Sequence, residues 1–116
     1  MSRTRTFLTI GSMALFAVTS VPAIAGAQDL AAKGQSVYAA QKCTTCHAIA
    51  GKGSKTNPLD GVGTKLSADE IRQWIVNPTE MTKKTGSTKK PPMPNRYNKL
   101  PAADLDALVA YLQSVK

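Results

Sequence analysis

The chain has 116 residues, with 15 Lys and Arg side chains against seven Asp and Glu, and a formal net charge of +8. Because domains usually contain about 100–150 residues, this length allows one domain and excludes most multi-domain enzymes. Only 5% of the residues are aromatic. A domain this small with so few large side chains needs a disulfide, a metal or a bulky cofactor as additional support.

Residues 1–27 match the three-part pattern of a secretory signal peptide: a short basic segment, an apolar stretch over residues 7–18, and then small residues. The small residues permit cleavage after Ala25 or Ala27, and we predict the second, which leaves a domain of residues 28–116. The alternative is an uncleaved membrane anchor, but a spanning helix needs about 20 apolar residues, and the apolar stretch over residues 7–18 is shorter than this. We therefore expect a periplasmic protein without stable membrane insertion after cleavage.

The first helix of the mature domain is expected to start at Asp29, a favourable N-cap residue. Leu30, Val37 and Tyr38 then share one face at the 3.6-residue period of a helix. Gly34 lies on the same face. Because a glycine within a helix costs about 1 kcal/mol relative to alanine, we expect Gly34 to permit the close approach of another helix.

Cys43-Thr44-Thr45-Cys46-His47 is a Cys-x-x-Cys-His sequence, the attachment motif of c-type haem. On a tight helical turn, this spacing lets each sulfur form a thioether with one haem vinyl group while the adjacent imidazole faces the iron. We therefore predict one haem c, attached covalently through Cys43 and Cys46, with His47 as an axial ligand.

Other chemistries of paired cysteines fit this chain less well. A thioredoxin-type dithiol belongs beside a strand–helix–strand pattern, and the sequence shows no convincing strand. A structural zinc site normally takes four Cys or His ligands, whereas the chain has two Cys and one His. A disulfide between Cys43 and Cys46 is compatible with export, but so short a loop constrains the unfolded chain little. A haem-free thiol or metal-binding protein is the remote alternative.

A second helix is predicted after Ser67, because Ser67 and Glu70 have the spacing of a capping box. Ile71 and Ile75 share one face of this helix. It should end at Asn77-Pro78, since the residue before a proline is disfavoured in the helical conformation.

The segment over residues 79–100 is predicted to be a long loop, and it contains Pro91-Pro92-Met93-Pro94. Loops of this length in compact domains usually have a function. Methionine is a known axial ligand of haem iron, and only Met81 and Met93 lie in the predicted mature domain. We favour Met93 because the prolines around it restrict the backbone that presents its sulfur. Met81 fits better as a packing residue.

The last helix is predicted to begin at Pro101, which suits the first helical position. It should run almost to Lys116, with Leu105, Leu108 and Leu112 on one stripe. About three main helices joined by long loops predict an all-α domain.

Together these features resemble the class I c-type cytochromes, small monohaem electron carriers, over residues 29–116. The resemblance rests on the Cys43–His47 motif, on Asn57-Pro58-Leu59, on the helix end Trp74–Pro78, on the Met93 loop and on residues 108–112. It implies a cytochrome c-like all-α fold with long loops wrapped around one covalently attached haem.

The resemblance also implies roles for individual residues around the haem. The Pro58 carbonyl is expected to accept a hydrogen bond from Nδ1 of His47 and so to orient the ring. Trp74 is expected to pack on the Met93 side of the haem. The first helix is expected to cross the last one at Gly34.

Ligation by both His47 and Met93 leaves iron no position for a substrate, so the sequence predicts an electron-transfer protein and not an enzyme. The Met93 loop is uniformly basic between Glu80 and Asp104, which predicts docking to acidic redox partners. The basic residues are Lys83, Lys84, Lys89, Lys90, Arg96 and Lys99. The alternative is that these charges only keep the loop soluble. Nucleic-acid binding is not expected, because no interleaved aromatic platform is present.

The leading interpretation is therefore a soluble periplasmic electron shuttle of a respiratory or other redox chain. Its partners would be a quinol-oxidising complex or dehydrogenase and a terminal oxidase or reductase. The alternative is a dedicated haem c subunit that accepts electrons within one periplasmic oxidoreductase.

Overall fold

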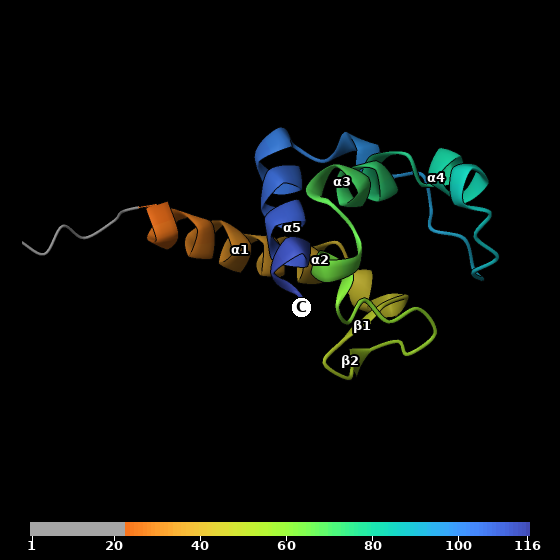
Figure 1. The fold of residues 1–116 in the computed structure, drawn as a ribbon, viewed down its shortest axis with the longest axis horizontal. Coiled ribbons are helices and arrows are strands. Elements are labelled where there is room, and N and C mark those ends of the chain that lie inside the picture. The colour runs from red at the N-terminus through yellow and green to blue at the C-terminus, as the bar shows by residue number, and fades with distance from the viewer. Residues whose placement is uncertain (1–22) are drawn as a thin grey trace, which may run out of the picture.

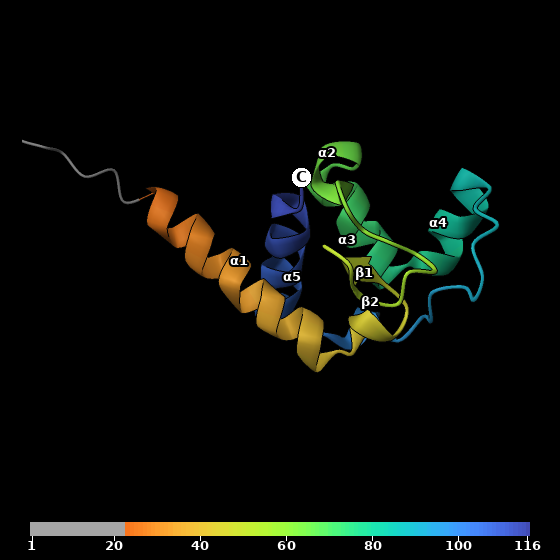
Figure 2. The same ribbon diagram turned by 90° about the horizontal axis from the view of Figure 1, so that it is seen from below.

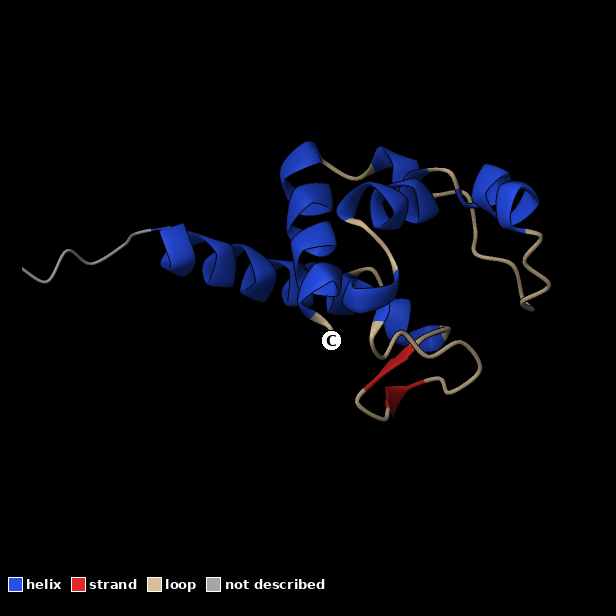
Figure 3. Cartoon of the chain, in the orientation of Figure 1, coloured by secondary structure: helices blue, strands red, loops and turns tan. Residues whose placement is uncertain are grey.

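The computed structural model describes residues 23–116 as a mainly helical structure, which confirms the predicted all-α class (Figures 1 and 3). In chain order the elements are α1 (Ala23–Ala40), the 3₁₀ helix η1 (Cys43–Thr45), β1 (Ala48–Ile49), β2 (Lys52–Gly53), α2 (Val62–Lys65), α3 (Ala68–Val76), α4 (Pro78–Thr85), the 3₁₀ helix η2 (Tyr97–Lys99) and α5 (Ala102–Ser114). Residues 1–22 of the predicted signal peptide lie outside the described residues. Cleavage after Ala27 stays a prediction.

Helices α1 and α5 cross at Gly34, and this crossing confirms the close approach predicted for that glycine (Figure 2). A Cβ atom on Gly34 would overlap the main-chain carbonyl of Ala107 and the Cβ of Tyr111. One turn further along α1, Tyr38 meets Tyr111 edge to face, with ring centroids 5.6 Å apart. The missing side chain at Gly34 is what lets the two backbones meet.

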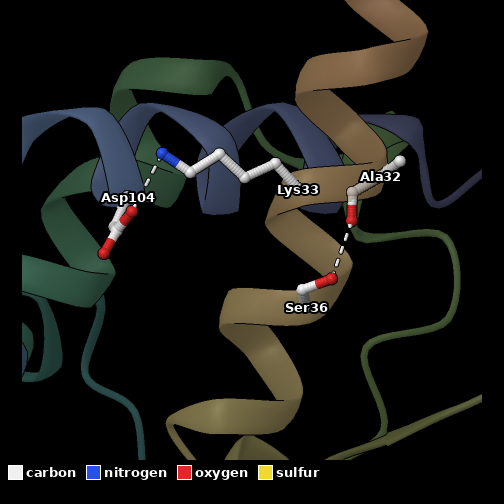
Figure 4. Close-up of polar contacts among 4 residues, drawn as sticks. All are labelled: Ala32, Lys33, Ser36 and Asp104. Carbon is white, nitrogen blue, oxygen red and sulfur yellow. Dashed lines mark hydrogen bonds and ion pairs between the residues drawn. The ribbon is translucent and has the colours of Figure 1, made fainter.

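An ion pair also joins these two helices: Nζ of Lys33 lies 3.0 Å from Oδ1 of Asp104 (Figure 4). In the same part of α1, the Ser36 hydroxyl donates a hydrogen bond of 3.4 Å to the Ala32 carbonyl. Because both members of the ion pair are partly exposed, it contributes at most about 1 kcal/mol. The backbone contact at Gly34 therefore contributes more to the geometry of the crossing than the charges do.

The predicted ends of the first and last helices need correction. Helix α1 begins at Ala23, so Asp29 lies inside the helix and does not cap it. Residues 23–28 include three alanines and no proline, so they can continue the helix. Helix α5 begins at Ala102, one residue later than predicted, because Pro101 has extended backbone angles and acts as the N-cap.

Helix α3 has the predicted boundaries. The Ser67 amide donates to the Glu70 carboxylate at 2.8 Å, and the Glu70 amide donates to the Ser67 hydroxyl at 3.2 Å, which completes the capping box. The helix ends at Val76, with Asn77 as its C-cap. The proline that follows stops α3 as expected.

The segment after Asn77 corrects the prediction of one long loop over residues 79–100. Helix α4 begins directly at Pro78. The first amide groups of a helix have no partner within the helix, so proline, which has no amide hydrogen, loses no hydrogen bond at this position. Pro78 and Met81 are both buried, and α4 packs against α3. Gly86 ends the helix in the left-handed conformation, with φ 65°. The stretch without helix between α4 and η2 is therefore limited to residues 86–96.

The C-terminus is fixed against α2. The Gly63 amide donates to the Val115 carbonyl at 2.8 Å, and Nζ of Lys116 donates to the Gly63 carbonyl at 2.9 Å. A Cβ on Gly63 would overlap the Gln113 carbonyl, so this is a second close approach of backbones. The sequence analysis did not predict this contact.

The hydrophobic core lies between α1, α3 and α5. Its buried members are Val37, Tyr38, Val62, Ile71, Ile75, Tyr97, Leu108, Val109 and Leu112. Beside the core, β1 and β2 form an antiparallel pair of two residues each. The sequence showed no strand here, because two residues are too few for an alternating pattern.

In the part of the chain from residue 23 onward, no helix combines the length and the apolar character needed to cross a membrane.

Candidate cofactor site

A cavity of about 820 Å³ lies between the segment that carries the cysteines, α3 and the loop before η2. This volume is within the range of about 300–1,000 Å³ that is usual for small-molecule and cofactor pockets. All of the predicted site residues line it: Cys43, Cys46, His47, Pro58, Trp74 and Met93. These six residues come from four separate parts of the chain and are brought to one cavity.

The Cys43–His47 segment forms the tight turn that haem attachment requires. Its start is marked by Lys42, which has the left-handed backbone angles φ 57° and ψ 35°. The Cys43 carbonyl then accepts bonds from the amides of Cys46 at 3.1 Å and His47 at 2.9 Å. Both cysteines are half-buried free thiols. One turn therefore presents two thiols and an imidazole to the cavity.

The His47 ring is held by a main-chain carbonyl. Nδ1 of His47 lies 2.8 Å from the Asn57 carbonyl oxygen. Because a carbonyl oxygen only accepts hydrogen bonds, this contact places the proton on Nδ1 and leaves the lone pair of Nε2 available to a metal. Second partners of this kind fix the orientation of metal-binding histidines.

The residue that supplies this carbonyl differs from the prediction, which named Pro58. The Leu59 amide donates to the Ala48 carbonyl at 2.8 Å. In a planar trans peptide, the C=O and N–H groups point in opposite directions. The Pro58 carbonyl, which shares a peptide unit with the Leu59 amide, is therefore directed away from the strand next to His47. Pro58 itself still lines the cavity.

The two methionines of the described residues occupy different environments. Met93 is half-buried, packs against the core and lines the cavity. Met81 is buried, with 7% of its surface exposed, and is not among the residues that line the cavity. Trp74 reaches the same cavity as Met93 from α3. Within the described chain, Met93 is thus the thioether that the cavity can use.

The wall next to Cys43 is poorly solvated. Burial raises the pKa of the Cys43 thiol to about 11, against smaller lowering effects from its own backbone and from the Arg96 guanidinium. Burial likewise raises the pKa of Tyr38 to about 12. The Tyr38 hydroxyl lies 3.5 Å from the His47 carbonyl, the limit of a hydrogen bond. Charged forms are therefore disfavoured on this side of the cavity.

Asn57, Tyr97 and Tyr38 are among the lining residues that sequence reasoning did not place at this site. Asn57 and Tyr97 had been assigned no individual role, and Tyr38 had been placed only on one face of the first helix. The sequence did contain one indication for Asn57, namely its position next to Pro58. No local pattern marks Tyr97, since its burial depends on the packing of η2 against α3.

The predicted basic residues are largely exposed. Lys83 is paired with Glu80 at 2.8 Å, which offsets its charge. Lys89 and Arg96 lie at the cavity itself. The Arg96 guanidinium donates a bond of 3.0 Å to the Tyr97 hydroxyl and lies 5.1 Å from the centroid of that ring.

The donor set fits a covalently attached haem. Thioether formation needs two free thiols at this spacing, and iron needs an imidazole nitrogen and a second axial donor. The cavity offers all of these within apolar walls. Within residues 23–116, no three His, Cys, Asp or Glu side chains come together as a site for a bare metal ion.

Comparison with protein-family models gives a match to the Cytochrome c family over residues 31–116. A search of curated proteins and a search of solved structures give no match. The matched region covers most of the chain and contains every residue that lines the cavity. The chain therefore belongs to the cytochrome c family, whose members are haem-binding electron-transfer proteins.

Proposed function

We propose that this chain is a soluble periplasmic one-electron carrier with a single haem c, attached through Cys43 and Cys46 and ligated by His47 and Met93. The observation that carries the proposal is the convergence of two free thiols, one oriented imidazole and one thioether on a single apolar cavity. When bound, haem iron supplies reversible exchange of one electron between its ferric and ferrous states.

The residues of the cavity favour electron transfer over catalysis. His47 is fixed through Nδ1 by the Asn57 carbonyl, so its position need not change with the charge of the site. Met93 as the second ligand leaves no position open to oxygen, peroxide or an organic substrate. Trp74 and the other apolar residues of the lining supply mainly apolar walls to the same space. A soft thioether ligand also favours the reduced state.

The basic residues support docking to acidic redox partners. Lys89 and Arg96 lie at the cavity, and Lys84, Lys90 and Lys99 are exposed in the same part of the chain. A field of one sign can raise the rate of association with an oppositely charged partner by about 10–1000-fold at low ionic strength. We propose a quinol-oxidising complex or dehydrogenase as electron donor and a terminal oxidase or reductase as acceptor.

The ligand assignment is tested with two matched variants, Met93→Leu and Met81→Leu, produced from the full chain in a host that attaches haem. Leucine conserves much of the methionine volume and removes the sulfur, so packing changes are small in both variants. We expect one haem by mass spectrometry in each protein. The weak sulfur-to-iron band at the red edge of the ferric spectrum should disappear in Met93→Leu and persist in Met81→Leu.

Two results contradict this proposal in different ways. Loss of the band in Met81→Leu with its retention in Met93→Leu would show that Met81, and not Met93, is the ligand. A wild-type protein with the mass of the bare polypeptide, and with both thiols open to alkylation, would show that no haem is attached.

A further inference from the structure

One side-chain polar atom in the described chain is buried without a hydrogen-bond partner: Oδ1 of Asn57. It belongs to the residue whose main-chain oxygen accepts the hydrogen bond from His47. Asn57 also lines the cavity. An unpaired buried oxygen is unfavourable for folding, because it loses its bonds to water and gains none in return. Such an atom beside a metal ligand calls for an explanation from the function of the site.

The Asn57 side chain carries a partial negative charge on Oδ1. This oxygen is buried and has no hydrogen-bond partner, so no donor within the described chain offsets its charge. The hydrogen bond from His47 goes to the main chain of Asn57, so the side chain acts on the site through its electric field.

We infer that the Asn57 side chain sets the reduction potential of the site and holds it lower than an apolar residue would. In an interior of low dielectric constant, a partial negative charge acts strongly on nearby ionic charge. Ferric iron carries one more positive charge than ferrous iron. A buried, uncompensated carbonyl oxygen therefore stabilises the ferric state more and opposes the uptake of an electron. This inference rests on the proposed haem site.

The test is a potentiometric titration of the haem-loaded full chain, in which dithionite delivers one electron per haem in the presence of mediators. Asn57→Leu replaces the amide by an apolar group of similar size and leaves the main-chain carbonyl to His47 in place. We expect its ferric-to-ferrous equilibrium constant to rise several-fold, where a tenfold rise corresponds to about 59 mV for one electron. Asn57→Asp adds negative charge at the same place and should lower the potential.

Asn98→Leu, which changes an exposed asparagine in η2, is the matched control and should leave the potential unchanged. A second readout is the denaturation midpoint, which should not fall in Asn57→Leu, because the variant removes an unpaired buried oxygen. If Asn57→Leu does not fold, Asn57→Ala makes the same electrostatic change with a smaller side chain.

The outcomes separate this inference from the proposed function. A haem-loaded Asn57→Leu or Asn57→Ala protein with a lower potential, or with a change below about twofold, which is about 18 mV at 59 mV per tenfold, overturns the role of Asn57 alone. In that case the proposed electron carrier stands. A wild-type protein that carries no haem overturns both.

Discussion

The main-chain carbonyl of Ala107 lies against Gly34, so that α1 and α5 meet backbone to backbone. Figure 2 shows the two helices side by side. This contact is important for the site because α1 ends at Ala40, three residues before Cys43. The crossing therefore fixes the position of the turn that carries both thiols and His47. Helix α5 at the same time contributes Leu108 and Leu112 to the cavity.

Gly34→Ala should destabilise the protein. The added methyl would overlap the Ala107 carbonyl, and a backbone group cannot move aside without shifting α5. Overpacking of this kind costs about 1–3 kcal/mol, which exceeds the gain of up to about 1 kcal/mol from better helix propensity. Urea unfolding of the haem-loaded protein measures the difference. Gln35→Ala, at the next and exposed position of α1, is the control and should have little effect. An unchanged midpoint in Gly34→Ala would contradict the crossing.

Gly63→Ala should also destabilise the protein, through the C-terminus. The methyl would overlap the Gln113 carbonyl and displace the bond between the Gly63 amide and Val115. We expect a loss of about 1–3 kcal/mol in the free energy of unfolding, together with faster exchange of the Gly63 amide hydrogen. Thr64→Ala, an exposed change in the same helix, controls for helix propensity. Equal midpoints for the two variants would show that the C-terminus is not fixed at α2.

Tyr38 should make stability depend on pH in the alkaline range. Its folded-state pKa is about 12, whereas the unfolded value is about 10. Between these values the unfolded chain loses a proton that the folded protein retains, so the free energy of unfolding falls as pH rises. The slope from this group is at most about 1.4 kcal/mol per pH unit. Below pH 10 its contribution is constant.

Tyr38→Phe removes this titration. We expect the difference in free energy of unfolding between wild type and Tyr38→Phe to be constant up to about pH 10 and to decline between about pH 10 and 12. Tyr111→Phe, which changes the other ring of the pair, should retain the wild-type decline. A difference between wild type and Tyr38→Phe that does not vary over this range would show that the Tyr38 hydroxyl is not buried in the folded protein.

Local chemistry explains what was predictable from the sequence. The capping box joins Ser67 and Glu70, three residues apart, and both of its hydrogen bonds are present. The Cys43–His47 turn is equally local, and its first three residues form the 3₁₀ helix η1. Gly34 was informative because an unfavourable residue within a helix implies a compensating contact elsewhere. The fold class follows from such features, and the family match supports it.

Longer-range contacts explain what was missed. Helix α4 depends on the burial of Pro78 and Met81, and no spacing within residues 78–85 indicates that α3 will cover them. The choice between Asn57 and Pro58 as partner of His47 depends on the direction of one peptide plane. A bond from Leu59 to Ala48 fixes that plane. Sequence motifs placed the residues at the cavity but did not specify which carbonyl faces the ring.

The double variant Lys89→Gln with Arg96→Gln should slow electron transfer to an anionic oxidant. Both side chains lie at the cavity, so their loss weakens attraction toward the site where the electron leaves. With ferricyanide as oxidant, the second-order rate constant measured by stopped flow should fall several-fold at low ionic strength, where the Debye length is about 30 Å at 0.01 M. The effect should shrink near 0.15 M, where that length is about 8 Å.

Lys52→Gln with Lys55→Gln is the matched control for that pair. It removes the same total charge from two exposed residues that do not line the cavity, so long-range attraction falls equally while the field at the cavity changes less. We expect the control to slow the reaction less than the cavity pair does, with a smaller dependence on salt. Equal rates for the two double variants would mean that only net charge steers the oxidant. The basic residues of the Met93 loop would then serve solubility and not docking.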